Sequence, residues 1–153
     1  MQLSDQNLCL LLLFCYALKV LVGMAAACLH LHHTCGIMHG DLYAHNILTP
    51  DEFSGSTQAL LTDFGAASFA PADKQAALLE RLEVRAFGCL MEDLLQRVPR
   101  EDLRSSSAAD SYHALEQLCG DCKYTTVELR PDFASISTRL SLVASRIEYH
   151  HQN

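Results

Sequence analysis

The sequence has no cluster of positive charge, and this absence excludes one class of partner at once. No run of Lys and Arg is longer than a dipeptide, and the formal net charge is −7. A protein that binds a nucleic acid duplex gathers Lys and Arg on one face, where they neutralise phosphates. Nucleic acid is therefore not an expected partner of this chain.

A disulfide framework is absent as well. The seven cysteines are scattered, mostly at apolar positions, and their number is odd. Disulfide-stapled domains are typically secreted and carry an even number of cysteines. The pattern instead indicates reduced, buried thiols in a cytoplasmic protein. Cys119 and Cys122 have the spacing of a zinc or redox motif, but no second pair accompanies them, so a structural role is favoured.

No basic residue precedes the apolar run of residues 8–29, and Lys19 is the only charge within it. The run is as long as a membrane span. A secretory signal, however, begins with positive charge, and a lysine at the centre of a span is costly. We therefore expect residues 17–34 to form a buried core helix, with a membrane span as the disfavoured alternative.

The chain does contain enough apolar material for one domain, because half of its 153 residues are hydrophobic. Short apolar runs at 47–49 and 59–62, on either side of a turn-rich loop, predict a small β-hairpin. Apolar periodicity predicts further helices over 79–97, 110–122 and 132–148. The expected fold class is therefore mainly α, with one hairpin that makes it a member of the α+β group.

Three motifs then follow one another in a fixed order. Residues 39–46 read HGDLYAHN, residues 63–65 read DFG, and residues 87–88, inside a predicted helix, read FG. Taken singly, each is a weak signal, since aspartate and asparagine are common in turns. The ordered set resembles the protein kinase family, in which the first motif is the catalytic loop and the second is the metal-binding triplet.

The resemblance covers residues 17–140. Segment 82–95 is similar to the buried helix that follows the activation segment, and 122–136 looks like the family's late Arg-Pro element. The resemblance implies a kinase C-terminal lobe over 17–148, helical with a small hairpin at the catalytic loop. An atypical segment, 1–16, precedes it. With its Gly-Asp-Leu-Tyr catalytic loop, this lobe resembles eukaryotic-like bacterial protein kinases.

The resemblance also implies a division of labour for phosphoryl transfer, with ATP and Mg²⁺ as cofactors. Asp41 would orient the attacking hydroxyl and take its proton. Asn46 and Asp63 would hold Mg²⁺ against the phosphates, because hard cations prefer oxygen ligands. Together these three residues form the predicted catalytic and metal site.

Four further residues match supporting positions of the family. Leu48 matches the floor of the adenine pocket. Thr62 directly precedes the metal-binding triplet, where its hydroxyl could orient nearby loop groups. His39 and Phe64 match positions that stack in the core and hold the two halves of the site in register.

Charged residues of the later segments have structural matches. Glu83 matches the position that the family gives to the Asp of its buried helix. Arg130 matches a buried Arg whose usual Glu partner is missing here, and a buried guanidinium needs a partner. We expect Arg130 to form an ion pair with Glu80, or failing that with Glu83.

Several departures from the family pattern bear on the activity. Gly40 replaces an Arg that binds a phosphorylated activation loop, and glycine there also resembles small-molecule phosphotransferases of the aminoglycoside and choline type. Tyr43 replaces the Lys that usually neutralises the γ-phosphate. Only seventeen residues separate Gly65 from Glu83, so the platform for a peptide substrate is short.

The 16 residues before the resemblance contain no Gly-rich loop, no lysine of an Ala-x-Lys motif and no helix-C glutamate. We therefore expect a partial ATP-dependent protein kinase domain that is inactive as an isolated chain, with an N-lobe supplied by upstream sequence. The alternatives are a pseudokinase-like scaffold and a small-molecule phosphotransferase of the same fold. The sequence does not identify a protein substrate.

Overall fold

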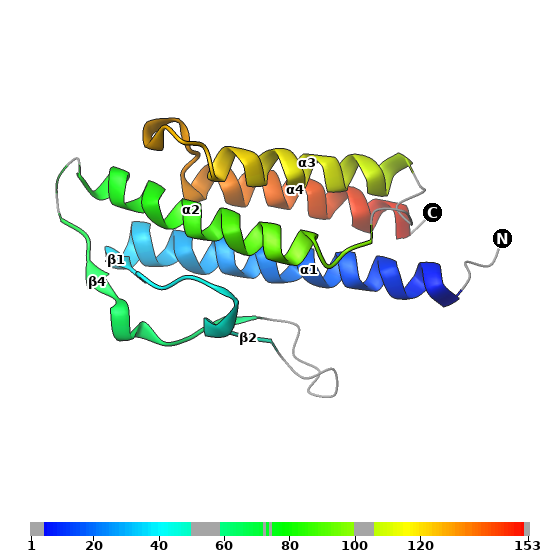
Figure 1. Cartoon of the computed structure of the whole chain (residues 1–153), viewed down its shortest axis with the longest axis horizontal. Coiled ribbons are helices and arrows are strands. Elements are labelled where there is room, and N and C mark those ends of the chain that lie inside the picture. The colour runs from blue at the N-terminus through cyan, green and yellow to red at the C-terminus, as the bar shows by residue number, and fades with distance from the viewer. Residues whose placement is uncertain (1–4, 50–58, 72, 74, 100–105, 152–153) are drawn as a thin grey trace.

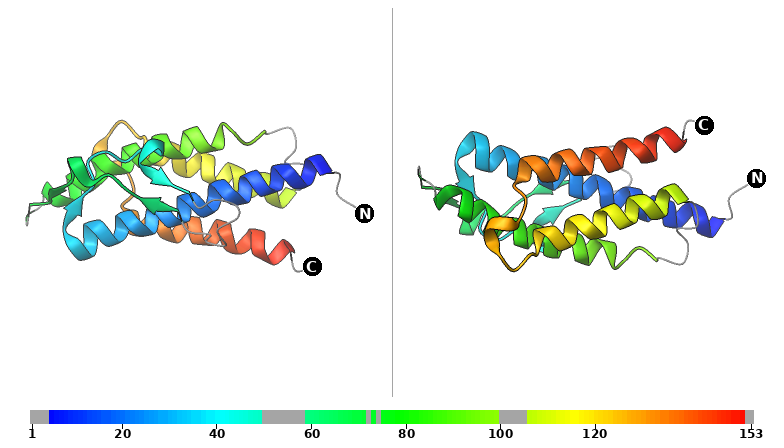
Figure 2. Two further views of the ribbon diagram at one scale, coloured as in Figure 1. Left: turned by 90° about the horizontal axis from the view of Figure 1, so that it is seen from below. Right: turned by 90° about the horizontal axis from the view of Figure 1, so that it is seen from above.

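The computed structural model describes residues 5–49, 59–71, 73, 75–99 and 106–151. Within these residues the long helices are α1 (Asp5–His30), α2 (Gln75–Leu95), α3 (Ser106–Cys122) and α4 (Phe133–His151). They lie side by side in an elongated bundle, and the segment that joins α1 to α2 runs along the outside of this bundle (Figures 1 and 2). The expected mainly α fold is confirmed.

The joining segment contains four two-residue strands. Strands β2 (Ile47–Leu48) and β3 (Leu60–Leu61) pair antiparallel, with Ile47 opposite Leu61, which confirms the predicted hairpin. Strands β1 (Ile37–Met38) and β4 (Ser68–Phe69) form a second antiparallel pair that the sequence did not reveal. The turn-rich loop expected at 50–57 lies outside the described residues.

Helix α1 is longer than predicted. It begins at Asp5 rather than at residue 17, so the boundary drawn at residues 16–17 falls inside it. The extension has a packing reason, because Phe14 is fully buried and continues the apolar face of the helix. At its other end, a π-helical turn (Leu31–Cys35) leads to Gly36, whose N–H donates to the carbonyl of Leu31 and which acts as the C-cap in the left-handed conformation.

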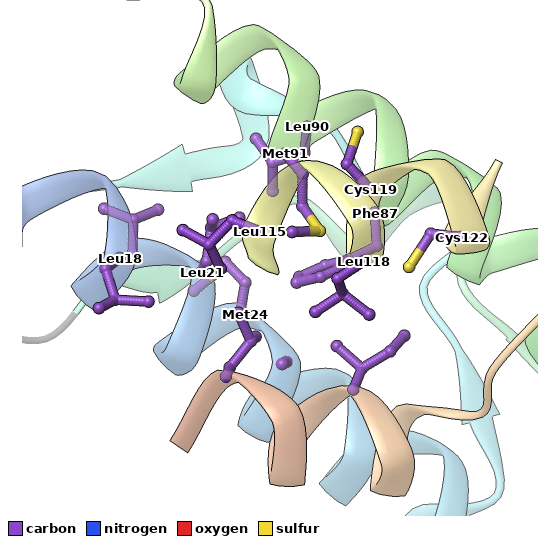
Figure 3. Packing of buried hydrophobic residues seen from close by; sticks show 14 of the residues in the cluster. Leu18, Leu21, Met24, Phe87, Leu90, Met91, Leu115, Leu118, Cys119 and Cys122 are labelled. Atoms are coloured by element: carbon purple, nitrogen blue, oxygen red, sulfur yellow. The ribbon is translucent and has the colours of Figure 1, made fainter. Parts of the chain in front are cut away.

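The core lies between the four helices (Figure 3). Helix α1 packs chiefly against α4 and α2 chiefly against α3, while α1 and α2 also touch each other. Phe87 of α2 and Phe133 of α4 are fully buried and meet edge to face, with ring centroids 5.7 Å apart. Aromatic pairs in this geometry stabilise a core beyond their buried area. Helix α2, which carries the FG motif, and helix α4, near the C-terminus, thus share one core.

The segment Leu12–Cys35 is long and apolar enough to cross a membrane, judged by length and composition alone. Forty-four per cent of its most apolar window is buried inside the bundle. The fully buried side chains include Leu21 and Met24, which face the other helices (Figure 3). This packing buries one side of the helix, so the buried core helix predicted for residues 17–34 is observed on that side only.

Helices α2 and α3 approach each other closely at Gly88. A Cβ atom placed on Gly88 would lie 2.8 Å from the Cβ of Cys122 and 2.8 Å from the Cγ of Lys123. The thiol of Cys119 donates to the carbonyl of Gly88 at 3.3 Å, and burial raises the pKa of Cys122 to about 12. Both thiols therefore serve as packing groups at this crossing.

The substitution Gly88→Ala tests the crossing. A mid-helix Gly→Ala change normally stabilises a helix by about 1 kcal/mol, but here we expect a loss of about 1–3 kcal/mol, because overpacking forces the helices apart. Gly120→Ala on α3 is the matched control, since its added Cβ meets nothing within 4 Å. Urea denaturation followed by circular dichroism measures both. Equal stability of the two variants would contradict the close approach.

Candidate active site

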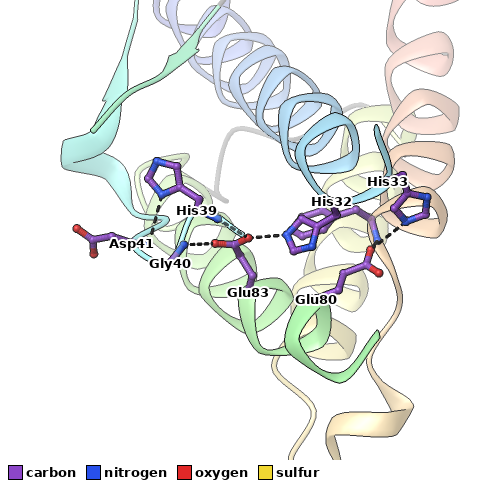
Figure 4. A network of polar contacts seen from close by, with 8 residues as sticks. His32, His33, His39, Gly40, Asp41, Glu80 and Glu83 are labelled. Carbon is purple, nitrogen blue, oxygen red and sulfur yellow. Dashed lines mark hydrogen bonds and ion pairs between the residues drawn. The ribbon is translucent and has the colours of Figure 1, made fainter. Parts of the chain in front are cut away.

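One carboxylate, that of Glu83 on α2, holds the loop that carries Asp41. Its Oε1 accepts a hydrogen bond from the N–H of Gly40 at 2.7 Å, and its Oε2 accepts one from the N–H of His39 at 3.2 Å. The Nε2 atom of His32 lies 2.5 Å from the same Oε2 (Figure 4). Figure 4 also shows Asp41 pointing away from Glu83, toward the outer side of the loop.

The charge state of Glu83 follows from these contacts. Burial alone would raise the pKa of this carboxyl, but hydrogen bonds from His32, Gly40 and His39 outweigh burial and lower the pKa. The ionised carboxylate is therefore the form that the fold stabilises. The part played by His32 was not predicted. A signal for it was available, because a buried helical glutamate requires a hydrogen-bonding partner.

A second carboxylate lies one helical turn away. Oε1 of Glu80 accepts a hydrogen bond from the N–H of Phe133 at 2.9 Å, and this N–H belongs to the unpaired first turn of α4. Nε2 of His33 lies 3.5 Å from the same oxygen (Figure 4). Two adjacent histidines of the π-helical turn thus face two carboxylates of α2, and these contacts connect α1, α2 and α4 below the catalytic loop.

The expected ion pair of Arg130 with Glu80 or Glu83 is wrong. Arg130 is 5% exposed, but its Nε donates to the carbonyl of Tyr124 at 2.8 Å and its Nη1 to the carbonyl of Arg81 at 2.9 Å. In return, Nη1 of Arg81 donates to the carbonyl of Arg130. In the part of the chain that the structure describes, Arg130 has no ion pair, because carbonyl oxygens satisfy it and the histidines and backbone occupy both acids.

Asp41 and Asn46 are held together within the catalytic loop. Nδ2 of Asn46 donates to Oδ2 of Asp41 at 3.0 Å and to the backbone carbonyl of Asp41 at 2.8 Å. Asp41 is exposed, whereas Leu42 and Asn46 are buried. Both bonds use the amide nitrogen of Asn46, so neither of them occupies its amide oxygen.

The hairpin brings Asp63 to the same place. Both the N–H and the hydroxyl of Thr62 donate to the carbonyl of Asn46, at 2.8 and 3.1 Å. The carbonyl of Thr62 in turn accepts a hydrogen bond from Nε2 of His39 at 2.9 Å. Asp63 is the next residue in the chain. A short chain of hydrogen bonds therefore runs from Asp41 through Asn46 to Thr62, the residue that directly precedes Asp63.

Asp63 itself has an unusual backbone. Its φ of 59° is the only positive value for a non-glycine residue in the described ranges, and such a conformation costs free energy. The turn is held by its Oδ1, which accepts from the N–H of Gly65 at 3.1 Å, and by the edge contact of Phe64 with His39, whose centroids are 4.9 Å apart. Strain of this kind is characteristic of functional sites.

Gly40 has a steric role that the sequence did not reveal. Its φ is 81°, and a Cβ atom there would lie 2.5 Å from the carbonyl oxygen of Ala66. The catalytic loop therefore touches the backbone just after the DFG triplet. An arginine therefore does not fit at this position in this conformation.

The donors of this site suit a hard cation. Asp63 and Asn46 offer oxygen atoms, and Mg²⁺ typically takes one or two protein carboxylates together with phosphate and water. No group of three or more His, Cys, Asp and Glu side chains in the described ranges is arranged to hold a metal ion. Leu48, on β2 beside Asn46, is 59% exposed and presents an apolar surface next to these donors.

The substitution Glu83→Gln tests the central carboxylate. Because the folded pKa of Glu83 lies below its ordinary value of 4.5, its stabilisation is complete above pH 4.5 and is lost as the pH falls through the folded pKa. At pH 7 we expect Glu83→Gln to lower the free energy of unfolding by about 2–3 kcal/mol, the range for a buried charged hydrogen bond. Below pH 4.5 its difference from the wild type should shrink.

The matched control is Glu92→Gln on the same helix. Glu92 forms an exposed ion pair with Lys123 at 2.6 Å, and such pairs contribute at most about 1 kcal/mol. Chemical denaturation between pH 3 and 7 measures all three proteins. A Glu83→Gln variant as stable at pH 7 as the Glu92→Gln variant would show that this carboxylate does not hold the loop.

A comparison with protein families agrees with this geometry. The chain matches the family described as lipopolysaccharide kinase (Kdo/WaaP) family over residues 19–105, which is more than half of its length and includes Asp41, Asn46, Asp63 and Glu83. No curated protein matches the chain. The interpretation as a kinase-fold phosphotransferase, for which ATP is the implied co-substrate, is thereby confirmed, while the match does not name a protein kinase. The chain belongs to the lipopolysaccharide kinase (Kdo/WaaP) family, a branch of the protein-kinase-like superfamily.

Proposed function

We propose that this chain is the acceptor- and metal-binding lobe of a kinase that transfers the γ-phosphate of ATP to a sugar hydroxyl. The hydrogen-bond chain Asp41–Asn46–Thr62, which brings Asp63 beside the catalytic loop, is the observation that carries this proposal. Phosphoryl transfer depends on positioning and charge neutralisation more than on covalent help from the protein. A rigid arrangement of two carboxylates and an amide supplies the positioning.

In this proposal each side chain has one task. The carboxylate of Asp41 takes the proton of the acceptor hydroxyl as its oxygen bonds to the γ-phosphorus and the bond to the β–γ bridging oxygen breaks. Asn46 and Asp63 would hold Mg²⁺ through their oxygen atoms, and such an ion would supply positive charge against the phosphates. Asn46 also orients Asp41 through its 3.0 Å hydrogen bond.

The nucleotide side of the site is proposed to lie at the β2–β3 hairpin. Leu48 and Leu60, which face each other across this hairpin, are 59% and 58% exposed. Exposed apolar side chains that lie together mark an interaction site. The proposal assigns Leu48 to the adenine ring and the opposite wall of the ATP cleft to a kinase N-lobe.

A sugar acceptor is favoured over a protein acceptor by two features. The matching family is described by a lipopolysaccharide, which is a sugar-rich molecule. The segment after the DFG triplet is short, since α2 begins at Gln75, so little chain remains to build a platform for a peptide.

The free thiols of the described cysteines support a reducing, cytoplasmic location, which is part of the same proposal.

Asp41→Asn and Asp63→Asn should separate the two roles. Mn²⁺, added with ATP to the chain extended with a kinase N-lobe, is a paramagnetic substitute for Mg²⁺ that broadens nearby amide signals in an NMR spectrum. We expect broadening at Asn46 and Thr62–Gly65, loss of it in Asp63→Asn, and retention in Asp41→Asn, because of these two aspartates only Asp63 is proposed as a metal ligand. Broadening spread over the whole surface, or equal in both variants, would contradict the assignment.

The transfer reaction itself is tested with labelled ATP and Mg²⁺. In these 153 residues alone we expect no detectable turnover, because half a cleft holds nucleotide poorly. In a chain extended with a kinase N-lobe, we expect label on sugar hydroxyls rather than on a Ser-, Thr- and Tyr-containing protein, and loss of transfer in Asp41→Asn. Label on the protein alone would favour the protein kinase interpretation. If metal changes neither the NMR signals nor the transfer of label, a scaffold function would be favoured.

A further inference from the structure

The π-helical turn at the end of α1 places a histidine and a cysteine side by side on the surface. Sγ of Cys35 lies 3.6 Å from Nε2 of His30, and both residues are exposed. Among the cysteines whose exposure the structure describes, Cys35 is the exposed one, while the others are buried or half-buried. The proposed phosphotransfer site uses neither residue, so an accessible thiol beside an imidazole is left without a role.

The pair depends on the geometry of this turn. His30 directly precedes the turn and Cys35 is its last residue, so the two are five residues apart. In an α-helix, where a turn takes 3.6 residues, side chains five residues apart point in different directions. A π-helical turn instead joins residue i to residue i+5, as the hydrogen bond from the N–H of Gly36 to the carbonyl of Leu31 does here. His30 and Cys35 are thereby brought onto one face.

The distance between the two donor atoms suits a single metal ion. In tetrahedral sites zinc bonds to sulfur at about 2.3 Å and to imidazole nitrogen at about 2.0 Å, so two such ligands stand about 3.5 Å apart. The observed separation of Sγ and Nε2 is 3.6 Å. Thiolate and imidazole are ligands that Zn²⁺ prefers, whereas Mg²⁺ and Ca²⁺ take oxygen ligands. The pair therefore selects a different ion from the one proposed for the catalytic site.

The position at a helix end also favours a cation. The last carbonyls of a helix carry partial negative charge, which stabilises positive charge nearby. In the ranges that the structure describes, no third His, Cys, Asp or Glu side chain completes a metal-binding group with the pair. The nearest histidine in sequence to Cys35, His33, has its Nε2 3.5 Å from Oε1 of Glu80. Water is then the ligand for the remaining two positions of a tetrahedral ion.

We propose that His30 and Cys35 form a zinc site and that the bound ion clamps the π-helical turn from outside. On binding, the thiol of Cys35 releases its proton to the solvent, and its sulfur bonds to Zn²⁺ together with Nε2 of His30 and two water molecules. No electron is transferred, and the thiol has to be reduced for the ion to bind.

The clamp acts on the residues between its two ends. His32 lies in the turn with its Nε2 2.5 Å from Oε2 of Glu83, and this carboxylate accepts hydrogen bonds from the N–H groups of His39 and Gly40 (Figure 4). A metal bridge across the turn restricts the movement of His32 and so protects the contacts that hold the catalytic loop. The inference goes beyond the proposed function, because it holds whether or not the chain transfers phosphate.

The test is an NMR titration of the ¹⁵N-labelled chain with Zn²⁺ under reducing conditions, and with Mg²⁺ for comparison. Zn²⁺ should shift the amides of residues 30–36 saturably at one ion per chain, and Mg²⁺ should not. Cys35→Ser and His30→Gln should each weaken zinc binding about 10-fold or more, since even the loss of a group behind a metal ligand costs that much. In the zinc-loaded wild type the amide of Gly40 should exchange with solvent about 3-fold or more slowly.

Cys89→Ser and His113→Gln are the matched controls, because they make similar changes at a half-buried cysteine of α2 and an exposed histidine of α3. Both should bind Zn²⁺ like the wild type. Co²⁺ gives a second measurement, since a cobalt–thiolate bond absorbs light and this absorption should vanish in Cys35→Ser. The proposal is overturned if the zinc shifts lie elsewhere, if Mg²⁺ reproduces them, if Cys35→Ser and Cys89→Ser behave alike, or if zinc leaves the exchange of Gly40 unchanged.

Discussion

The carboxylate of Glu83 is the group on which the arrangement of the site depends. It reaches from the core helix α2 to two consecutive backbone amides, those of His39 and Gly40, and so fixes the start of the catalytic loop. The residues that follow in the loop are each held by a further contact. Leu42 enters the core, Asn46 bonds back to Asp41, and the hairpin carries Thr62 to Asn46. A buried carboxylate with three hydrogen bonds thus anchors the start of the loop.

Two histidines contact the acids that lie behind the catalytic loop. His32 lies against Glu83 and His33 against Glu80, and both histidines belong to the π-helical turn at the end of α1. Local π-helical geometry is frequent at functional sites. Here it directs two adjacent side chains toward two acids on one face of α2. The end of α1 is thereby connected to Glu80 and Glu83 of α2.

The helices and the β2–β3 hairpin could be predicted from the sequence, whereas contacts between residues far apart in the chain could not. The helices and the β2–β3 hairpin follow from apolar periodicity and turn residues, which are local properties. The order of the motifs predicted Asp41, Asn46 and Asp63 as site residues. The structure shows Asn46 bonded to Asp41, and Thr62, the neighbour of Asp63, bonded to Asn46, while the roles of the three residues stay predictions. The Arg130 ion pair was wrong because a guanidinium can be satisfied by carbonyl oxygens, which no side-chain pattern records. The β1–β4 pair and the partnership of His32 with Glu83 depend on tertiary packing, which likewise leaves no local signal.

The contact of Gly40 with the carbonyl of Ala66 has a consequence for how such a site can be controlled. The two segments touch backbone to backbone, and neither has a side chain there that could rotate to make room. Any side chain at position 40 would push the catalytic loop away from the turn that carries Asp63. In this conformation, control through a cationic side chain at position 40 is therefore sterically excluded.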